Sequence, residues 1–444
     1  MTAIYYTLGV LVFAVAIMAS IGLHEFGHLI PAKKFGGKVT QWFVGFGPTL
    51  WSKKIGETEY GIKAIPLGGY VKIVGMLPPG KGSDGDDSRV RKSNTGMFTQ
   101  LVSDARAAEW EHIGPEDRDR LFYKRSWWQK VVVMSGGPLV NLAIAFFLFW
   151  GVFATVGQVA DLKVDPVVAE VVPCIVPADE DERVCTAEEL VNNPSPAAAA
   201  GLEPGDRFVS FNGSEVSSWE QMQQFIRDNN DDTAAIVVER DGERLTLEVT
   251  TSVQPRPIDA DSEELTKVGF LGVMPVVTPI IETGGPIYTA QQMGTMTVEV
   301  VKSLGQLPVK VFGVAKAIVG LEERDPNGPV SVVGGGRLAG EVAADERFLL
   351  KDKVTSLVML IAGFNLFIGL FNFIPLLPLD GGHIAGALYE GLRRGFARLR
   401  GRPDPGYVDV ARLLPIAYVM GLALLVMGIV LIIGDIVVPL HLPT

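Results

Sequence analysis

The chain of 444 residues is 48% hydrophobic and only 20% charged, whereas soluble domains carry about 25% charged residues. This composition excludes a disordered chain, a collagen-like chain and a small disulfide scaffold, and it disfavours a purely soluble protein. A formal net charge of −11 argues against a broad nucleic-acid-binding surface. Two cysteines are too few for a thiolate zinc site.

Four apolar stretches are long enough to cross a bilayer as helices. They run over 4–23, 131–159, 354–379 and 413–438. We interpret the first as a retained span, because it lacks the basic leading region and the small-residue cleavage site of a signal peptide. A buried core helix is the alternative for any one of them. The sequence predicts a polytopic α-helical membrane protein that lies in a lipid bilayer.

The charges between these stretches predict an orientation. Segment 31–130 carries 17 Lys and Arg against 11 Asp and Glu, and 389–412 carries six Arg against three acids. Segment 158–349 carries 14 basic against 32 acidic residues. The positive-inside rule places the two basic segments in the cytoplasm. We therefore expect an inner (plasma) membrane protein whose two termini and long acidic segment are extracytoplasmic.

The long acidic segment contains a compact domain, predicted over 160–255. Its β-rich runs surround the turns Asn212-Gly213 and Asp241-Gly242 and a polar helix at 219–227. The runs lie at 167–172, 207–211, 235–239 and 244–250. Cys174 and Cys185 belong to a polar insertion, where an oxidising compartment would allow a disulfide; two free thiols are the alternative.

The chemistry-bearing motif is His24-Glu25-Phe26-Gly27-His28 at the end of the first apolar stretch. On a helix, residues i and i+4 share a face, so His24 and His28 can place two imidazoles on one metal ion. Glu25 is positioned to take a proton from water at such a site. Zinc is the usual metal for this arrangement. A cluster of polar side chains at a helix end, without a metal, is the alternative.

A zinc site usually needs a third protein ligand, and Asp380 is the best candidate. It follows Pro375 and Pro378 at the end of the third apolar stretch, which runs in the same direction as the first, so the two ends lie at similar depth. This depth is near the cytoplasmic face. His383 is a competing ligand, and a simple helix-ending turn is the alternative for Asp380.

Two further features of the sequence have a structural and a functional interpretation. Asn141, in GGPLVN, either packs between helices or belongs to the site, and we favour packing by small residues. Residues 40–75 alternate and are rich in glycine, which predicts β-hairpins. A sheet edge there would hold a substrate in extended form, whereas a plain cytoplasmic β-loop is the alternative.

Several motifs, in order along nearly the whole chain, resemble the site-2 protease family of intramembrane metalloproteases. The chain is similar to the RseP-like bacterial group, especially to actinobacterial members with one PDZ domain. The motifs are HEFGH at 24–28, GFGP at 45–48, IPLGGYVKIVGM at 65–76, GGPLVN at 136–141, SPAAAAGLEPGDRFVSFNG at 195–213 and NFIPLLPLDGGH at 372–383.

This resemblance implies one zinc ion per chain, held by His24, His28 and Asp380, with Glu25 as the catalytic residue. It implies that Asn372 binds substrate or supports the centre. The β region would present the substrate, and we look for capture of its backbone at Gly68 and Gly69.

The resemblance also implies the substrates: single-span membrane proteins, such as anti-sigma factors, already cut outside by another protease. The PDZ domain would meet a peptide C-terminus or a substrate ectodomain. A membrane transporter or metal carrier and a non-catalytic PDZ scaffold are the competing interpretations of the whole chain.

The expected organisation divides the chain into eight segments. They are a first membrane helix at 1–31, a cytoplasmic region at 32–128 with a sheet at 40–75 and a flexible loop at 78–121, a second membrane helix at 129–159, a PDZ-like domain at 160–258, a membrane-proximal segment with an amphipathic helix at 259–350, a third membrane helix at 351–384 that ends in LDGGH, a cytoplasmic loop at 385–411 and a fourth membrane helix at 412–438.

Overall fold

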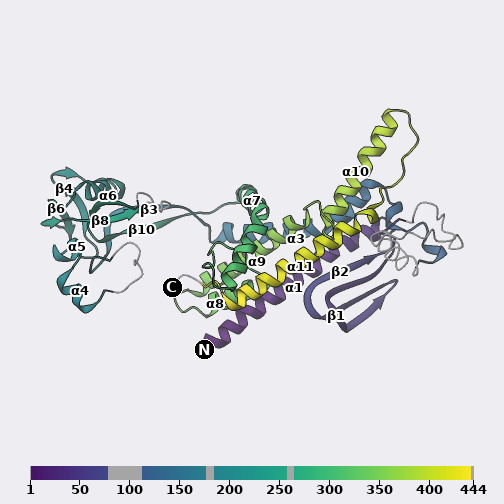
Figure 1. Cartoon of the computed structure of the whole chain (residues 1–444), viewed down its shortest axis with the longest axis horizontal. Helices are drawn as coiled ribbons and strands as arrows, with labels where there is room; N and C mark the ends of the chain where they lie inside the picture. Colours follow the sequence, from purple (N-terminus) through teal and green to yellow (C-terminus); the bar gives the residue numbers. More distant parts are fainter. Residues whose placement is uncertain (1, 79–112, 177–184, 258–264, 442–444) are drawn as a thin grey trace. The chain divides into compact units, whose positions relative to one another are not determined.

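The computed structural model describes residues 2–78, 113–176, 185–257 and 265–441. Most of the expected flexible loop at 78–121 therefore lies outside the described residues. The chain forms two compact units (Figure 1). One unit comprises Met1–Val156 and Thr283–Thr444, and the other comprises Gly157–Glu282.

Four helices of the first unit are long and apolar enough to cross a membrane, as the sequence predicts. The membrane-length helices are α1 (Thr2–Lys34), α3 (Trp127–Thr155), α9 (Leu350–Asn372) and α11 (Leu414–Val437). Their most apolar windows have mean hydropathy between 2.1 and 2.8. Together with the β-rich regions, these helices make the chain a polytopic membrane protein.

Helices α1 and α3 touch backbone to backbone at two glycines. A Cβ on Gly136 would lie 1.9 Å from the Gly27 carbonyl oxygen, and a Cβ on Gly27 would lie 2.3 Å from the Gly136 carbonyl oxygen. Small residues allow helices to approach this closely, as GGPLVN predicted. This crossing brings the HExxH turn of α1 directly onto α3.

Two further helices pack against these membrane-length helices. Helix α8 (Val332–Ala344) lies on α1, where a Cβ on Gly9 would come 2.4 Å from the Ala339 carbonyl oxygen. Helix α7 (Pro286–Ile318) packs on α11, α3 and α9. The segment 259–350, where an amphipathic helix is expected, thus contains the long helix α7, and its expected position at the membrane surface stays a prediction.

The third apolar stretch does not continue as one helix to residue 384. Helix α9 ends at Asn372, and α10 (Asp380–Leu399) begins after a break that contains Pro375 and Pro378. The expectation that LDGGH ends the third membrane helix is wrong: Asp380 opens the next helix. Proline removes a backbone N–H donor and disfavours a helical residue before it, so the two prolines separate the helices.

The sheet in the first unit is built from two long, bent strands, β1 (Val39–Ile55) and β2 (Thr58–Ile73). The first part of β1 pairs on both sides, because 41–44 faces 59–62 on one side and 69–72 on the other. Within the described residues, no strand pairs with the outer side of 69–72. The predicted hairpins are present, and 69–72 forms a free edge.

The second unit is an antiparallel sheet with strand order β10-β3-β4-β6-β7 and a separate hairpin of β8 and β9. Helix α6 (Trp219–Asp228) covers a core that includes Phe208, Met222 and Ile236. The unit extends to Glu282 because β10 pairs with β3, so it passes the boundary expected at 258. The strands are β3 (Gln158–Val171), β4 (Arg207–Phe211), β5 (Ser214–Glu215), β6 (Thr233–Arg240), β7 (Glu243–Thr250), β8 (Ser252–Pro257), β9 (Leu265–Phe270) and β10 (Val273–Glu282).

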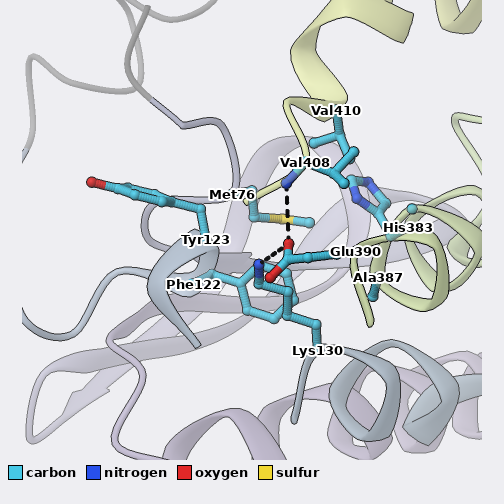
Figure 2. Close-up of a pocket in the computed structure, with 10 residues that line it drawn as sticks. Met76, Phe122, Tyr123, Lys130, His383, Ala387, Glu390, Val408 and Val410 are labelled. Carbon is cyan, nitrogen blue, oxygen red and sulfur yellow. Dashed lines mark hydrogen bonds and ion pairs between the residues drawn. The ribbon is translucent and has the colours of Figure 1, made fainter. Parts of the chain in front are cut away.

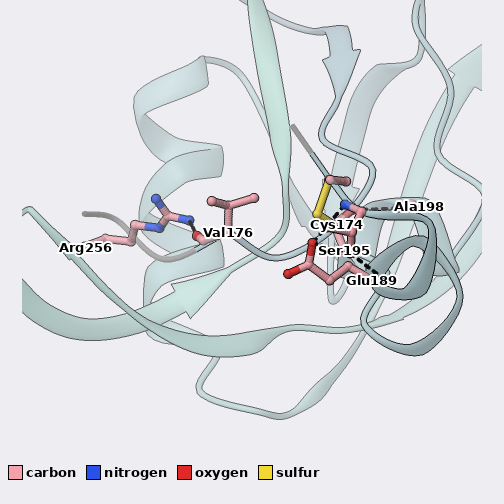
Figure 3. Close-up of a disulfide and its surroundings, with 8 residues drawn as sticks. Cys174, Val176, Glu189, Ser195, Ala198 and Arg256 are labelled. Atoms are coloured by element: carbon pink, nitrogen blue, oxygen red, sulfur yellow. Dashed lines mark hydrogen bonds between the residues drawn. A yellow bond between two sulfur atoms is a disulfide. The ribbon is translucent and has the colours of Figure 1, made fainter. Parts of the chain in front are cut away.

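The polar insertion of this unit is closed by a disulfide between Cys174 and Cys185, whose Cα atoms lie 6.1 Å apart (Figure 3). Arg256 donates to the Val176 carbonyl oxygen at 2.9 Å, which ties the insertion to the β8–β9 hairpin. Short helices complete the chain. They are α4 (Ala187–Asn192), α5 (Pro196–Ala199), η1 (Pro115–Asp117), η2 (Phe122–Lys124) and η4 (Val410–Leu413).

Candidate active site

The two histidines of the HExxH motif and the aspartate of LDGGH meet at one point. His24 Nε2 lies 3.2 Å from His28 Nε2, and each of these atoms lies 3.3 Å from Asp380 Oδ2. The histidines come from one face of α1, one turn apart, and the aspartate is the first residue of α10. Residues 356 positions apart in the sequence thus bring their donor atoms together.

These spacings suit a zinc ion. Zinc bonds of about 2.0–2.1 Å in a tetrahedron separate neighbouring ligand atoms by about 3.3–3.4 Å. Among the described residues, His24, His28 and Asp380 form the one group of three or more His, Cys, Asp or Glu side chains close enough to share a metal ion. Two imidazole nitrogens and a carboxylate leave one position for water or substrate, which is typical of catalytic zinc sites.

A glycine on α3 makes room for this donor set. A Cβ on Gly137 would lie 2.3 Å from His28 Nε2 and 2.7 Å from His24 Nε2. Any larger residue would occupy the space beside the two Nε2 atoms. The site therefore depends on the absence of a side chain at position 137.

Helix α3 also holds the other nitrogen of each imidazole. His24 Nδ1 lies 2.9 Å from Asn141 Oδ1, and His28 Nδ1 lies 2.8 Å from the Val133 carbonyl oxygen. A hydrogen bond from Nδ1–H to each oxygen leaves both Nε2 atoms as acceptors, the form that binds metal. The preference for Asn141 as a packing residue is thus corrected, since its amide orients a candidate ligand.

Asn141 is itself fixed by a third helix. Its Nδ2 donates to Asn365 Oδ1 at 3.3 Å, and Asn365 Nδ2 donates to the Ile361 carbonyl oxygen at 2.9 Å. Both asparagines are fully buried. This contact between α3 and α9 joins residues 224 positions apart, so sequence patterns alone do not predict it.

Glu25 lies on α1, is half-buried, and faces the free edge of the sheet. A Cβ on Gly69 would lie 3.1 Å from Glu25 Cγ and 3.0 Å from the Ile21 side chain of α1. Edge residues 69–72 therefore run directly past the glutamate. Gly68 has φ +95°, where a side chain is disfavoured, and it allows β2 to bend just before this edge.

Two other predicted residues lie apart from the donor set. Asn372 Nδ2 donates to the Ile368 carbonyl oxygen of its own helix at 3.0 Å, and no bond links it to the three donors. His383 lines a separate small cavity with Glu390 and Lys130 (Figure 2). The geometry gives no support to His383 as a competing ligand.

Ion pairs outside the membrane-length helices fasten the sheet. Lys38 Nζ lies 2.7 Å from Asp117 Oδ2, and Arg120 binds both carboxylate oxygens of Glu57 at 2.7 Å. The Arg120 guanidinium lowers the pKa of Glu57. The segment at 117–120 thus holds the start of β1 and the turn before β2 in place, and with them the edge beside Glu25.

An HExxH turn that meets a carboxylate from a second helix, in a chain with four membrane-length helices, is the arrangement expected of a membrane metallopeptidase. The sequence model of Peptidase family M50 matches residues 12–412. The chain belongs to this family, the site-2 protease family, as the sequence motifs predicted. It is an intramembrane zinc metalloprotease with zinc as its cofactor.

Individual relatives agree with this assignment. The zinc metalloprotease Rip1 of Mycobacterium tuberculosis is 34% identical over 98% of this chain and 99% of its own length. The Rip1 protein of Mycolicibacterium smegmatis is 34% identical over 94% of each chain. A putative zinc metalloprotease of Mesorhizobium japonicum is 29% identical over 85% of this chain and 88% of its own length. The transporter interpretation is not favoured.

Proposed function

We propose that His24, His28 and Asp380 hold the zinc ion of this peptidase and that Glu25 is its catalytic base. The observation that carries the proposal is the meeting of three donor atoms within 3.3 Å of one another, with Glu25 one residue from a ligand. Bound zinc supplies a Lewis acid and lowers the pKa of water.

In the proposed reaction, Glu25 accepts a proton from the attacking water as the water oxygen bonds to the scissile carbonyl carbon. Glu25 then passes this proton to the amide nitrogen, so that the carbon–nitrogen bond breaks and the amine leaves. The Glu25 carboxylate is unchanged at the end of the cycle. The close approach of Gly69 to Glu25 Cγ places the glutamate side chain beside the sheet edge, where a substrate backbone would lie.

We propose that the substrate binds as an added strand at edge 69–72. A helical substrate hides its carbonyl groups in hydrogen bonds, so it must be extended before it is cut. The free N–H and C=O groups of an edge strand bind an extended chain without regard to its side chains. Gly69 keeps this edge within contact of Glu25. Asn372 is the further candidate for holding the substrate beyond the edge.

The substrates proposed for this site are single-span membrane proteins that another protease has already shortened outside the cell. The acidic segment 158–349 and the basic segment 31–130 support an extracytoplasmic second unit and a site near the cytoplasmic side. The PDZ-like motif at 195–213, followed by a strand and α6, supports a PDZ-like fold for this unit. The disulfide Cys174–Cys185 is consistent with an oxidising compartment.

The test compares Glu25→Gln with the wild-type protein on a membrane-embedded reporter substrate. We expect the variant to bind one zinc ion per chain and to cleave about 10²–10⁴ times more slowly. Glu299→Gln, at an exposed position on α7, is the matched control and should cleave normally. Unchanged turnover in Glu25→Gln would remove this residue from the mechanism, and metal flux into liposomes without cleavage would favour a transporter.

A further inference from the structure

One face of α3 carries every contact described above between this helix and the two histidines. Val133 contacts His28, Gly137 lies beside both imidazoles, and Asn141 contacts His24. Lys130 stands one turn before Val133, and positions 130, 133, 137 and 141 follow the helical repeat. Lys130 therefore lies on the same face of α3 as the residues that contact the two histidines.

Lys130 is joined to α10, the helix that begins with Asp380. Its Nζ lies 2.8 Å from Glu390 Oε2, and both side chains are buried, with 8% and 2% of their surfaces exposed (Figure 2). Asp380, His383, Ala387 and Glu390 are spaced as i, i+3, i+7 and i+10, so they share one stripe of α10. The two stripes face one another, with a metal ligand near one end and an ion pair near the other.

Three groups contact the Glu390 carboxylate. Besides Lys130, it accepts from the Val408 backbone N–H at 3.2 Å, and Arg394 lies 3.2 Å from its other oxygen. Next to it, a Cβ on Gly391 would lie 2.6 Å from the ring of Trp127 at the start of α3. Helix α10 makes its main packing contact with α3, so these residues determine where α10 lies along it.

We propose that the Lys130–Glu390 ion pair is a positioning contact for the metal site, because it fixes the register of α10 on α3 and thereby the place of the Asp380 carboxylate. The inference rests on the proposed ligand set. A buried ion pair contributes little net stability compared with an apolar pair of similar shape, but it allows only a narrow range of distances and directions. Zinc–ligand bond lengths lie within about 0.2 Å of their usual values. An ion pair that restricts the position of α10 favours an Asp380 carboxylate already placed to form such a bond.

A small cavity lies beside the ion pair. Its volume is about 20 Å³, room for one water molecule, and its walls include Met76, His383 and Val410 in addition to the charged pair. Packing therefore leaves a gap of this size beside Glu390. At such a gap, a directional charge contact restricts how far α10 slides or turns.

The experiment measures zinc affinity by competition with a chelator, together with thermal unfolding, in the full-length protein in detergent. The variants are Glu390→Gln, Lys130→Met and the double variant Lys130→Met/Glu390→Leu, with Glu299→Gln as the control for the loss of a glutamate charge. Removing partners that orient a ligand typically weakens metal binding about 10–100-fold. We expect at least a tenfold loss for each of the three pair variants and no change for the control.

The double variant separates positioning from stability. It removes both charges of the pair. The Val408 N–H loses its acceptor, but Arg394 keeps Asp404 as a partner at 3.5 Å, so the variant should unfold near the wild-type temperature. Weaker zinc binding in this folded variant supports the proposal even if Glu390→Gln does not fold. Zinc affinity within twofold of the wild type, in either Glu390→Gln or the double variant, would overturn it. Failure of the wild-type chain itself to bind zinc would instead refute the proposed ligand set.

Discussion

Replacing Gly137 by alanine tests the metal site with a single methyl group. Position 137 lies inside α3, and its backbone is helical, so alanine needs no change of backbone conformation. Alanine should even favour the helix by about 1 kcal/mol. The added Cβ, however, would lie 2.3 Å from His28 Nε2 and 2.7 Å from His24 Nε2. The same substitution thus favours the helix and disfavours the site.

The expected magnitude follows from these two distances. Ordinary contacts of a Cβ begin near 3.4 Å, so His28 Nε2 has to move by roughly 1 Å or the helices have to separate. Overpacking of this kind costs about 1–3 kcal/mol. If the imidazoles take up the shift, zinc binding weakens about 5- to 150-fold, because each 1.4 kcal/mol is about a factor of ten.

The assay is zinc affinity by chelator competition, with cleavage of a membrane-embedded reporter as the second readout. Gly151→Ala is the matched control: it lies on the same helix, and a Cβ there meets nothing within 4 Å. We expect normal zinc binding and normal cleavage for the control, and loss of both for Gly137→Ala. If Gly137→Ala binds zinc as tightly as the control, His24 and His28 do not hold the ion in the arrangement described.

Two further predictions concern the orienting amide and the second unit. Asn141→Leu removes the partner of His24 Nδ1 and should weaken zinc binding about 10–100-fold. Asn372→Leu should leave zinc binding unchanged and raise KM. Equal zinc affinities in the two variants would contradict the orienting role of Asn141. In the second unit, burial raises the pKa of Asp206, but hydrogen bonds from Arg240 and the Glu203 N–H lower it by more, so that the net pKa lies below its usual range. The stabilisation by this carboxylate is therefore present above about pH 4 and is lost as the pH falls through the lowered value. The protection factors of the β4 amides, corrected for the intrinsic exchange rate at each pH, should fall in acid in the wild type and lack that acid-induced fall in Asp206→Asn. The same acid dependence of the protection factors in both proteins would refute the assignment.

Local patterns in the sequence determined much of this protein. Apolar stretches of twenty or more residues predict membrane helices, because backbone N–H and C=O groups in lipid must hydrogen-bond to one another within the helix. The i, i+4 spacing of His24 and His28 fixes a shared face on any helix. Alternation with glycine at 40–75 predicts the hairpins, and the runs at 207–211 and 244–250 predict strands that the structure contains. Each of these signals depends on residues close together in the chain.

Contacts between distant segments had to come from the tertiary structure. Asp380 was one of two candidate ligands in the sequence, and the start of α10 after the prolines decides that its carboxylate reaches the histidines. The role of Asn141 depends on the crossing of α1 and α3 at two glycines, which brings an amide on one helix to an imidazole on the other. The pairing of Lys130 with Glu390 joins residues 260 positions apart. Sequence periodicity identifies the face of a helix, but only packing determines which face of which neighbour it meets.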